Sequence, residues 1–286
     1  MSRVRDLLRD AAQALSATVD EPALEAQLLL AHALGRDRAW LYAWPEHQVP
    51  AAASALFLDL VQRRCAGQPV AYLTGRRAFW SLSLEVTPDT LIPRPETEHL
   101  VEIALGLDLP ADARVLELGT GSGAIALALA SERPGWRIDA IERSPAALAV
   151  ARANAAALGL DQLRWLQGDW FDPVAPGSRY ALIVANPPYV ADDDPHLARG
   201  DLRFEPRAAL ASGSDGLADI RAIVAAAPGH LERGGWLWLE HGADQAPAVA
   251  ALMSAAGLAS VRTVRDLAGH ERHTGGRTPG FIPLDP

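Results

Sequence analysis

The sequence has little of the patterns that mark several special classes of protein. Cys65 is the only cysteine among 286 residues, which excludes an internal disulfide and a cysteine-based metal site. No apolar run is long enough to cross a bilayer, which takes about 20 residues. The first residues, Met1 to Asp6, mix acids and bases without a continuous apolar stretch, unlike a signal peptide. We therefore expect a cytoplasmic protein that has no contact with a membrane.

The sequence also lacks a tract rich in Lys or Arg, and its formal net charge is −9. A protein that grips a nucleic-acid backbone usually presents a basic face. We therefore expect no direct nucleic-acid partner, and a protein or a small molecule as substrate. No heptad pattern appears, so we expect a monomer.

Histidine is scattered, and none of the eight histidines has helix-face metal spacing with an acid between two of them. The His270–His273 segment, His-Glu-Arg-His, is interpreted as a solvated loop. We assign no metal site.

Residues 1–75 are predicted to form a small helical bundle. Val4, Leu7, Leu8, Ala11 and Leu15 recur at steps of three and four residues, as on one face of a helix. Further helices are expected from Pro22 to Leu34 and from Ala51 to Cys65, with breaks at glycine and proline. Short connections between helices are typical of a bundle domain.

Residues 76–98 are predicted to form a hairpin and a linker. Polar and apolar residues alternate from 78 to 87, which is a strand pattern. The stretch 90–98 contains Pro93 and Pro95, so we expect an extended connection there. A short helix is expected over 99–105.

From residue 99 to the end at 286 we predict one catalytic domain of the α/β class. Strands are expected at 114–118, 137–142, 163–167, 180–185 and 234–240, with weaker candidates at 259–265 and 278–282. Helices are expected at 122–132, 145–158 and 216–232. Repeated strand–helix units favour a mainly parallel sheet covered on both faces.

A glycine-rich turn follows the first of these strands. Gly119, Thr120, Gly121, Ser122 and Gly123 come directly after Leu118. Glycine lets backbone N–H groups approach a ligand closely. The G-x-G-x-G spacing fits the dinucleotide fingerprint poorly. Glu117 beside the turn would repel a pyrophosphate but suit the cationic methionine end of S-adenosylmethionine.

Acids follow the next two strands. Glu142 ends the second strand at the offset expected for an acid that holds ribose hydroxyls. Asp169 follows the third strand and could accept from the exocyclic amine of adenine, while Trp170 or Phe171 could stack on the ring. Taken alone, the glycine turn could be a tight turn, Glu142 a solvated acid and Asp169 a helix cap. Together they fall at the edge of an open sheet where ligands bind.

The fourth strand ends in Asn186-Pro187-Pro188-Tyr189. An amide nitrogen is a poor nucleophile because its lone pair is delocalised, so catalysis has to hold the NH₂ group in one orientation. The Asn186 side-chain oxygen and the Pro187 carbonyl can accept its two N–H bonds, and Tyr189 can pack flat on the target. Taken alone, this tetrapeptide could be a rigid exposed turn. Beside a cofactor site it predicts methyl transfer to a planar nitrogen.

These motifs together resemble the bacterial release factor glutamine methyltransferases, the HemK/PrmC family. The similarity covers almost the whole chain and includes these segments: Gly67–Gly75, Phe79-Trp80, Leu91–Glu98, the glycine turn, Asn186–Tyr189 and Arg203–Pro206. The Pro-Arg-Pro-Glu-Thr-Glu stretch at 93–98 is more specific than the glycine turn, which many methyltransferases share.

The resemblance implies a seven-stranded, Rossmann-like class I methyltransferase domain with a small N-terminal helical domain. The position of that helical domain alone leads us to expect that it docks the protein substrate. The resemblance also implies transfer of a methyl group from S-adenosyl-L-methionine to N5 of the glutamine in the Gly-Gly-Gln motif of class-one peptide chain release factors, with S-adenosyl-L-homocysteine as product. The Gly119–Gly123 turn, Glu142, Trp170 and Asn186 would bind the cofactor. Asn186 to Tyr189 would hold the substrate glutamine.

Two other functions fit parts of the sequence. A nucleic-acid adenine N6 methyltransferase would use the same Asn-Pro-Pro-Tyr chemistry on a flipped base, and the acidic net charge argues against it. A non-catalytic protein could dock a partner through its helical domain, and the intact Asn186 and Tyr189 argue against lost activity.

Overall fold

The computed structural model describes residues 2–280, which divide into two compact units. The helical unit contains the residues up to Arg76 together with Ala198–Phe204. The sheet unit contains Arg77–Leu197 and the chain from Glu205 onward. The hairpin and the proline-containing stretch after it therefore cluster with the sheet unit.

The helical unit is built on apolar stripes that face one another. Its helices are α1 (Val4–Leu15), α2 (Pro22–Leu34), α3 (Arg38–Ala43), α4 (Ala51–Cys65), α5 (Val70–Thr74) and the 3₁₀ helix η2 (Gly200–Phe204). Its core contains fully buried side chains such as Leu15, Leu29 and Phe57. Packing of amphipathic helices at these spacings gives most of the stability of such a bundle.

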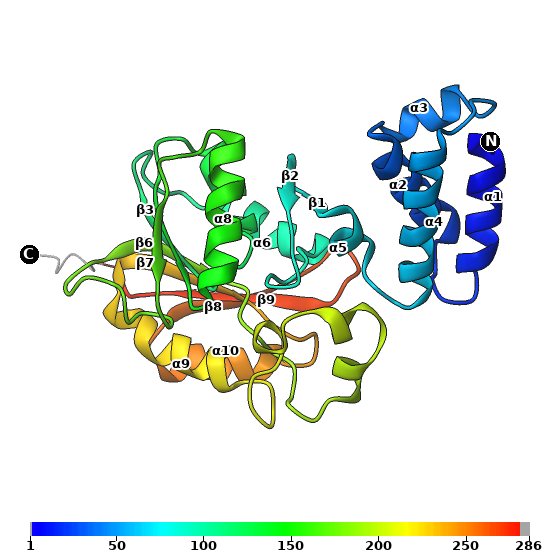
Figure 1. The fold of residues 1–286 in the computed structure, drawn as a ribbon. Helices are drawn as coiled ribbons and strands as arrows, with labels where there is room; N and C mark the ends of the chain where they lie inside the picture. Colours follow the sequence, from blue (N-terminus) through cyan, green and yellow to red (C-terminus); the bar gives the residue numbers. More distant parts are fainter. Residues whose placement is uncertain (1, 281–286) are drawn as a thin grey trace, which may run out of the picture. The chain divides into compact units, whose positions relative to one another are not determined.

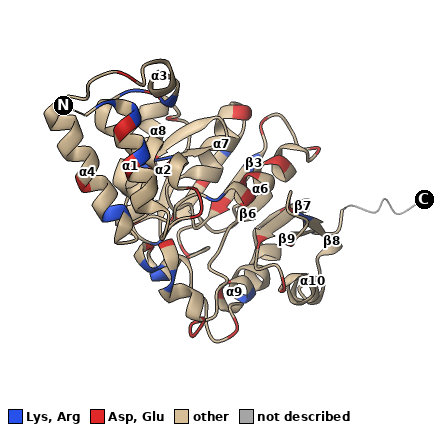
Figure 2. Ribbon diagram, turned by 90° about the vertical axis from the view of Figure 1, so that its right-hand side faces the viewer, with Lys and Arg blue, Asp and Glu red and all other residues tan. Residues whose placement is uncertain are grey.

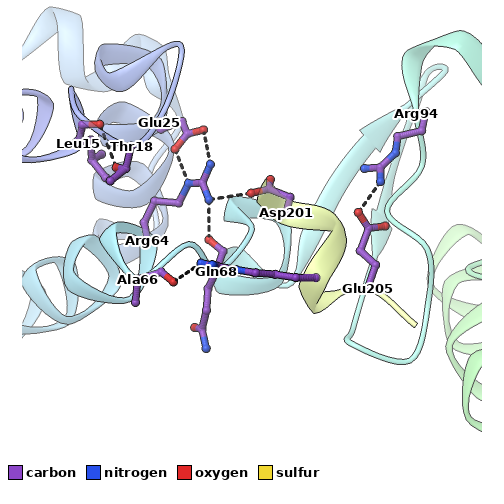
Figure 3. A network of polar contacts seen from close by, with 10 residues as sticks. Leu15, Thr18, Glu25, Arg64, Ala66, Gln68, Arg94, Asp201 and Glu205 are labelled. Atoms are coloured by element: carbon purple, nitrogen blue, oxygen red, sulfur yellow. Dashed lines mark hydrogen bonds and ion pairs between the residues drawn. The ribbon is translucent and has the colours of Figure 1, made fainter. Parts of the chain in front are cut away.

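A buried arginine joins the late segment of the chain to the helical unit. Arg64 on α4 is 7% exposed, and its guanidinium donates to Glu25 at 2.6 Å and to Asp201 at 2.8 Å. Figure 3 shows these contacts of Arg64, and Arg203 also donates to the carbonyl of Ala66 at 2.6 Å. These bonds explain why residues 198–204 belong with helices that lie far earlier in the chain.

The sheet unit contains a seven-stranded sheet within the described residues, in the order β5-β4-β3-β6-β7-β9-β8. Its strands are β3 (Arg114–Leu118), β4 (Arg137–Glu142), β5 (Arg164–Gln167), β6 (Tyr180–Ala185), β7 (Leu231–Glu240), β8 (Ala259–Arg265) and β9 (Glu271–Arg277). Strands β3 to β7 pair in parallel, while β9 runs antiparallel to both β7 and β8. A separate hairpin consists of β1 (Arg76–Phe79) and β2 (Leu82–Glu85).

Helices cover both faces of the main sheet, as expected for an α/β domain. They are α6 (Pro95–Leu105), α7 (Ala124–Glu132), α8 (Pro145–Leu158), α9 (Ala218–Ala226) and α10 (Ala246–Ala255), with short 3₁₀ turns η1 (Pro195–Ala198), η3 (Arg207–Ala209) and η4 (Ala227–Gly229). Successive strand residues point to opposite cores: Val115 packs with α6 and α7, whereas Leu116 packs with α9 and α10. Figure 1 shows α9 and α10 on the face opposite α6 and α8.

The register of the parallel strands aligns their carboxyl ends. Leu118 at the end of β3 pairs with Ile141 of β4 on one side and with Ala185 of β6 on the other. Glu142 in turn pairs with Gln167 at the end of β5. The turns that follow these strands therefore start beside one another. The strand order also reverses between β3 and β6, which is where ligands bind in open α/β sheets.

Three predictions about the later part of the chain are wrong. The helix expected to reach residue 232 ends at Ala226, because Pro228 leads into a 3₁₀ turn and Leu231 already pairs with β6. The strand expected at 278–282 is absent from 278–280, while 281 and 282 lie outside the described residues. The strand runs instead over 271–277, so His270–His273 is not a solvated loop: His273 is fully buried.

The linker prediction is also partly wrong. Residues 90–94 are extended as expected, but α6 begins at Pro95 rather than at residue 99. Proline suits the first turn of a helix, where its missing N–H has no partner to lose. The acidic Glu96 and Glu98 also lie in that first turn, near the positive end of the helix dipole.

Within the described residues, neither the charged residues nor the apolar helices form a pattern that the composition did not already suggest. Acidic and basic residues are interspersed along the ribbon in the view of Figure 2. Across residues 2–280, none of the helices combines the length and the apolar character needed to span a bilayer.

Candidate active site

The glycine turn after β3 is held open by backbone geometry. Gly119, Gly121 and Gly123 have φ angles of 72°, 56° and 87°, in the region that only glycine enters without strain. The N–H groups of Gly119 and Thr120 both donate to the carbonyl of Ile141 at 2.9 Å. A Cβ on Gly121 would meet no atom within 4 Å, whereas one on Gly123 would lie 2.9 Å from Leu127. Gly121 therefore leaves space for a ligand, and Gly123 allows close helix packing.

Glu117 stabilises the turn through buried hydrogen bonds. Its side chain is 1% exposed, and its Oε2 accepts from the hydroxyl of Thr120 and, at 3.1 Å, from the N–H of Ala126. Burial raises the pKa of Glu117 to about 8. The carboxyl group ties the turn to the start of α7, and it is not among the residues that line the cavity described below.

Glu142 and Asp169 lie at the ends of β4 and β5, as the sequence predicts. Glu142 accepts from the N–H of Gly121 at 2.9 Å and from the N–H of Ser144 at 2.8 Å. Asp169 is half exposed and lies 3.9 Å from the guanidinium of Arg143. Arg143, whose role the sequence did not explain, therefore approaches the acid proposed for adenine.

Trp170, rather than Phe171, faces the cofactor turn. A Cβ on Gly119 would lie 3.4 Å from the Trp170 ring. The indole N–H donates to Asp219 at 3.2 Å, which fixes the ring, and φ of Trp170 is 39°. Phe171 instead stacks on His230, with the ring centres 4.4 Å apart.

The turn after β6 is held by side chains from three other segments of the chain. The Asn186 side-chain nitrogen donates to the hydroxyl of Thr97 on α6 at 3.0 Å. The Tyr189 hydroxyl donates to Glu240 at 3.3 Å, and Gln245 donates to the Tyr189 carbonyl at 2.9 Å. Burial, followed by the nearby Glu240 carboxyl group, raises the pKa of Tyr189, so its hydroxyl stays protonated.

Behind Tyr189 lies a buried polar cluster that the sequence did not reveal. Glu240 is 1% exposed and lies 3.8 Å from the Nε2 of His273, which packs edge-on against His99 of α6. Burial lowers the pKa of His99. Within residues 2–280, no group of His, Cys, Asp and Glu side chains has an arrangement that could hold a metal ion.

A cavity of about 280 Å³ lies at this edge of the sheet. Of the sequence-predicted residues, these line it: Gly119, Gly121, Glu142, Asp169, Trp170, Asn186 and Pro188. The others, Thr120, Ser122, Gly123, Pro187 and Tyr189, are not among its lining residues. Thr120 and Ser122 are 4% and 2% exposed, so they support the turn instead of facing the cavity.

The charge of the cavity favours a cationic ligand. Its acidic lining residues are Asp89, Glu142, Asp169 and Asp219, and its only basic lining residue among those described is Arg143. A pyrophosphate would be repelled by this set, whereas a sulfonium and an ammonium group would be attracted. At Gly121 a ligand can approach the backbone closely. The Trp170 ring provides a flat apolar wall. These residues fit S-adenosylmethionine.

The cavity is also lined by two segments that were not predicted from the sequence to belong to it. They are residues 88–91 and the stretch that contains Pro206, Ala208 and Ala209. Glu205, whose side chain is fully buried, joins them: it accepts from the N–H of Ile92 at 3.0 Å and pairs with Arg94 (Figure 3). The motifs Leu91–Glu98 and Arg203–Pro206, which carry the family resemblance, overlap these two segments. That overlap was the one sequence signal that could have assigned them to the cavity.

Comparison with known proteins agrees with this architecture. A family model described as the PrmC N-terminal domain matches residues 6–75, and one described as the methyltransferase small domain matches residues 98–203. The solved structure of a methyltransferase from Pyrococcus furiosus has a TM-score of 0.54 at 19% identity, covering 77% of this chain and 98% of its own. That likeness supports the methyltransferase fold.

Relatives of known function are much closer in sequence. The release factor glutamine methyltransferase of Burkholderia pseudomallei (strain K96243) is 56% identical over 90% of this chain and 93% of its own length. The protein with that name in Pseudomonas aeruginosa is 51% identical over 97% of this chain and 99% of its own length. Matches of this extent, across both units, leave one conclusion: the chain belongs to the release factor glutamine methyltransferase family.

Proposed function

We propose that the protein transfers a methyl group from S-adenosyl-L-methionine to the N5 amide nitrogen of the glutamine in the Gly-Gly-Gln motif of class-one peptide chain release factors, leaving S-adenosyl-L-homocysteine. One observation carries the proposal. Leu118 and Ala185 are paired neighbours in the sheet, so the glycine turn and Asn186 begin side by side and line one cavity. A donor on the first can therefore reach an amide on the second.

The residues of the cofactor side have separate tasks in this proposal. Gly119 and Gly121 bring the backbone close to the donor. Glu142 accepts from the ribose hydroxyls, and Asp169 and Trp170 bind the adenine. When bound, S-adenosylmethionine supplies an electrophilic methyl group on a cationic sulfur. The acidic lining of the cavity attracts that charge in the ground state.

The residues after β6 orient the amide. Asn186 and the backbone of Pro187 accept the two N–H bonds, and the rigid proline backbone aims the second acceptor. Tyr189 packs against the plane of the amide. Each hydrogen bond contributes about 0.5–1.5 kcal/mol net, whereas alignment for in-line attack can contribute about 7–11 kcal/mol in favourable cases. In this transfer the C–S bond of the sulfonium would break as the C–N bond forms, and the nitrogen would release one proton to water. Orientation of the amide by these residues then supplies most of the rate enhancement.

A direct experiment separates this function from its rivals. The purified protein is incubated with methyl-labelled S-adenosylmethionine and one of three substrates: a class-one release factor, the same factor with its loop glutamine replaced by alanine, or duplex DNA. We expect label only in the unmodified release factor, and peptide mass spectrometry should place it on that glutamine. Label in DNA would favour adenine methylation. Equal label in the alanine variant would contradict the proposal.

The helical unit is proposed to dock the protein substrate. Most of the large apolar side chains that the described residues expose lie on it: Tyr42, Trp44, Leu56 and Leu58. Exposed aromatic and aliphatic side chains of this kind are enriched at protein interfaces. The substitution Trp44→Ser should raise KM for a whole release factor several-fold and leave KM for a short glutamine-loop peptide unchanged. An equal rise for both substrates would contradict docking by this unit.

We further propose that the enzyme acts in the cytoplasm as a monomer. All the residues assigned to the cavity come from one chain, so the site needs no second copy. Sedimentation in the presence and absence of a release factor tests the oligomeric state.

A further inference from the structure

We propose that Thr97 is a positioning residue that determines which end of the Asn186 side-chain amide faces the substrate. This inference rests on the proposed function. Thr97 is 4% exposed and lies on α6, and its hydroxyl accepts from the Asn186 side-chain nitrogen at 3.0 Å. Asn186 itself is half buried at the cavity wall. The bond spans 89 residues of sequence and links two of the motifs that characterise the chain.

The chemical argument depends on the asymmetry of an amide. One end of the Asn186 side chain carries two N–H donors and the other an oxygen acceptor. A target NH₂ group needs an acceptor, and a second NH₂ facing it would repel it. When the Asn186 nitrogen bonds Thr97, the oxygen is the end left to face the cavity. Thr97 therefore selects the orientation that methyl transfer to an NH₂ group requires.

The start of α6 is fixed well enough to serve as this support. Arg94, which precedes the helix, pairs with the fully buried side chain of Glu205. Glu98 accepts from the backbone N–H of Trp80 at 2.9 Å and so ties the hairpin to the helix. Each of the three polar residues Arg94, Thr97 and Glu98 thus has its own partner. The Pro-Arg-Pro-Glu-Thr-Glu stretch acts as a scaffold for the turn after β6.

The test compares two substitutions of Thr97. Thr97→Val keeps the shape of the side chain and removes the hydroxyl, whereas Thr97→Ser keeps the hydroxyl. We expect Thr97→Val to lower kcat about 10-fold, with KM for the release factor and Kd for S-adenosylmethionine within about twofold of the wild type, since one hydrogen bond is lost. Thr97→Ser should keep kcat within about twofold of the wild type because the hydrogen bond remains.

A matched control measures the general effect of removing a hydroxyl. Thr263 lies on β8 at the sheet edge, and its hydroxyl contacts Thr274 rather than Asn186. Thr263→Val should leave kcat unchanged. Wild-type kcat in Thr97→Val, equal losses in the Val and Ser variants, or a loss that appears only in cofactor affinity would each overturn the inference.

A second readout does not depend on turnover. The Asn186 side-chain amide protons, followed by NMR, should exchange slowly in the wild type and in Thr97→Ser, and faster in Thr97→Val. Equal exchange in all three proteins would overturn the inference even if the enzyme were active. Failure of the wild type to methylate a release factor would instead overturn the proposed function, so the two failures are distinguishable.

Discussion

The turns after β3 and β6 begin beside each other but are held in place by opposite means. The Gly119–Gly123 turn is held by its own backbone, whose N–H groups bond to Ile141 and Glu142, and its glycines leave room for a ligand to approach that backbone. The Asn186–Tyr189 turn keeps bulky side chains and is fixed by polar contacts from Thr97, Glu240 and Gln245. In the proposed function, one sheet edge therefore holds the methyl donor by backbone contact and the acceptor amide by side-chain orientation.

The largest expected effect comes from removing the central side chain of the second turn. Asn186→Ala should lower kcat about 100-fold or more, because both the acceptor and the orientation of the target amide are lost. The melting temperature should change little, since Asn186 is only half buried. Steady-state methylation of a release factor, together with thermal unfolding, measures both quantities. Turnover within tenfold of the wild type would mean that the second turn does not orient the target amide through Asn186.

Glu117, which stabilises the glycine turn, should make the stability of the protein depend on pH. Burial raises the pKa of Glu117 from 4.5 to about 8 in the folded protein. Between these values the folded state holds a proton that the unfolded chain releases, so this contribution to stability is complete below pH 4.5 and is lost as the pH rises through 8. Over that window the effect is on the order of a few kcal/mol.

Glu117→Gln cannot titrate, and its unfolding free energy should fall less steeply between those pH values. Denaturant unfolding of both proteins at several pH values measures the difference. Parallel profiles for the variant and the wild type would contradict the raised pKa.

Substitutions at two glycines, one in the first turn and one elsewhere, test whether the first turn binds the cofactor. Gly121 and Gly159 have φ angles of 56° and 67°, and a Cβ on either would meet no atom within 4 Å. Alanine at each position should cost about 1 kcal/mol of stability through backbone strain. Only Gly121→Ala should also weaken S-adenosylmethionine binding, by about 10-fold, because its Cβ enters the space kept for the ligand. Calorimetric titration that found equal affinities in both variants would argue against this site.

The smallest effect is expected from Tyr189→Phe, which keeps the flat ring and removes the bond to Glu240. Stability should fall by about 1 kcal/mol, because a buried acceptor loses its partner. The value of kcat should stay within about threefold, since the packing surface remains. Tyr189→Ala, measured in the same assay, should lose far more activity. A Phe variant as impaired as the Ala variant would give the hydroxyl a larger role than packing.

The sequence predicts those parts of the fold and site that depend on local pattern. The strands at 114–118, 137–142 and 180–185 end where expected, because buried parallel strands are continuous apolar runs that stop at recognisable turns. The seven-stranded fold inferred from the family resemblance is likewise confirmed. Because parallel strands end at a common edge, the residues that follow each strand can be assigned to that edge from the amino-acid sequence alone.

Features that depend on distant parts of the chain could not be predicted. Strand β9 has no apolar alternation: it buries Gly275 and Gly276, and a Cβ on Gly275 would lie 2.2 Å from the ring of Trp238. The partner of Thr97 is equally remote in sequence, as is Asp201, which bonds Arg64 across 137 residues. Local periodicity carries no information about such contacts.

The most direct test of the shared sheet edge is a crystal structure with S-adenosylhomocysteine and a glutamine-containing loop peptide of a release factor. The cofactor product should lie along Gly119 and Gly121. The glutamine nitrogen should lie within hydrogen-bond distance of both the Asn186 side-chain oxygen and the Pro187 carbonyl, with its free face toward the sulfur. A glutamine bound elsewhere, or a sulfur on the far side of Asn186, would contradict the account.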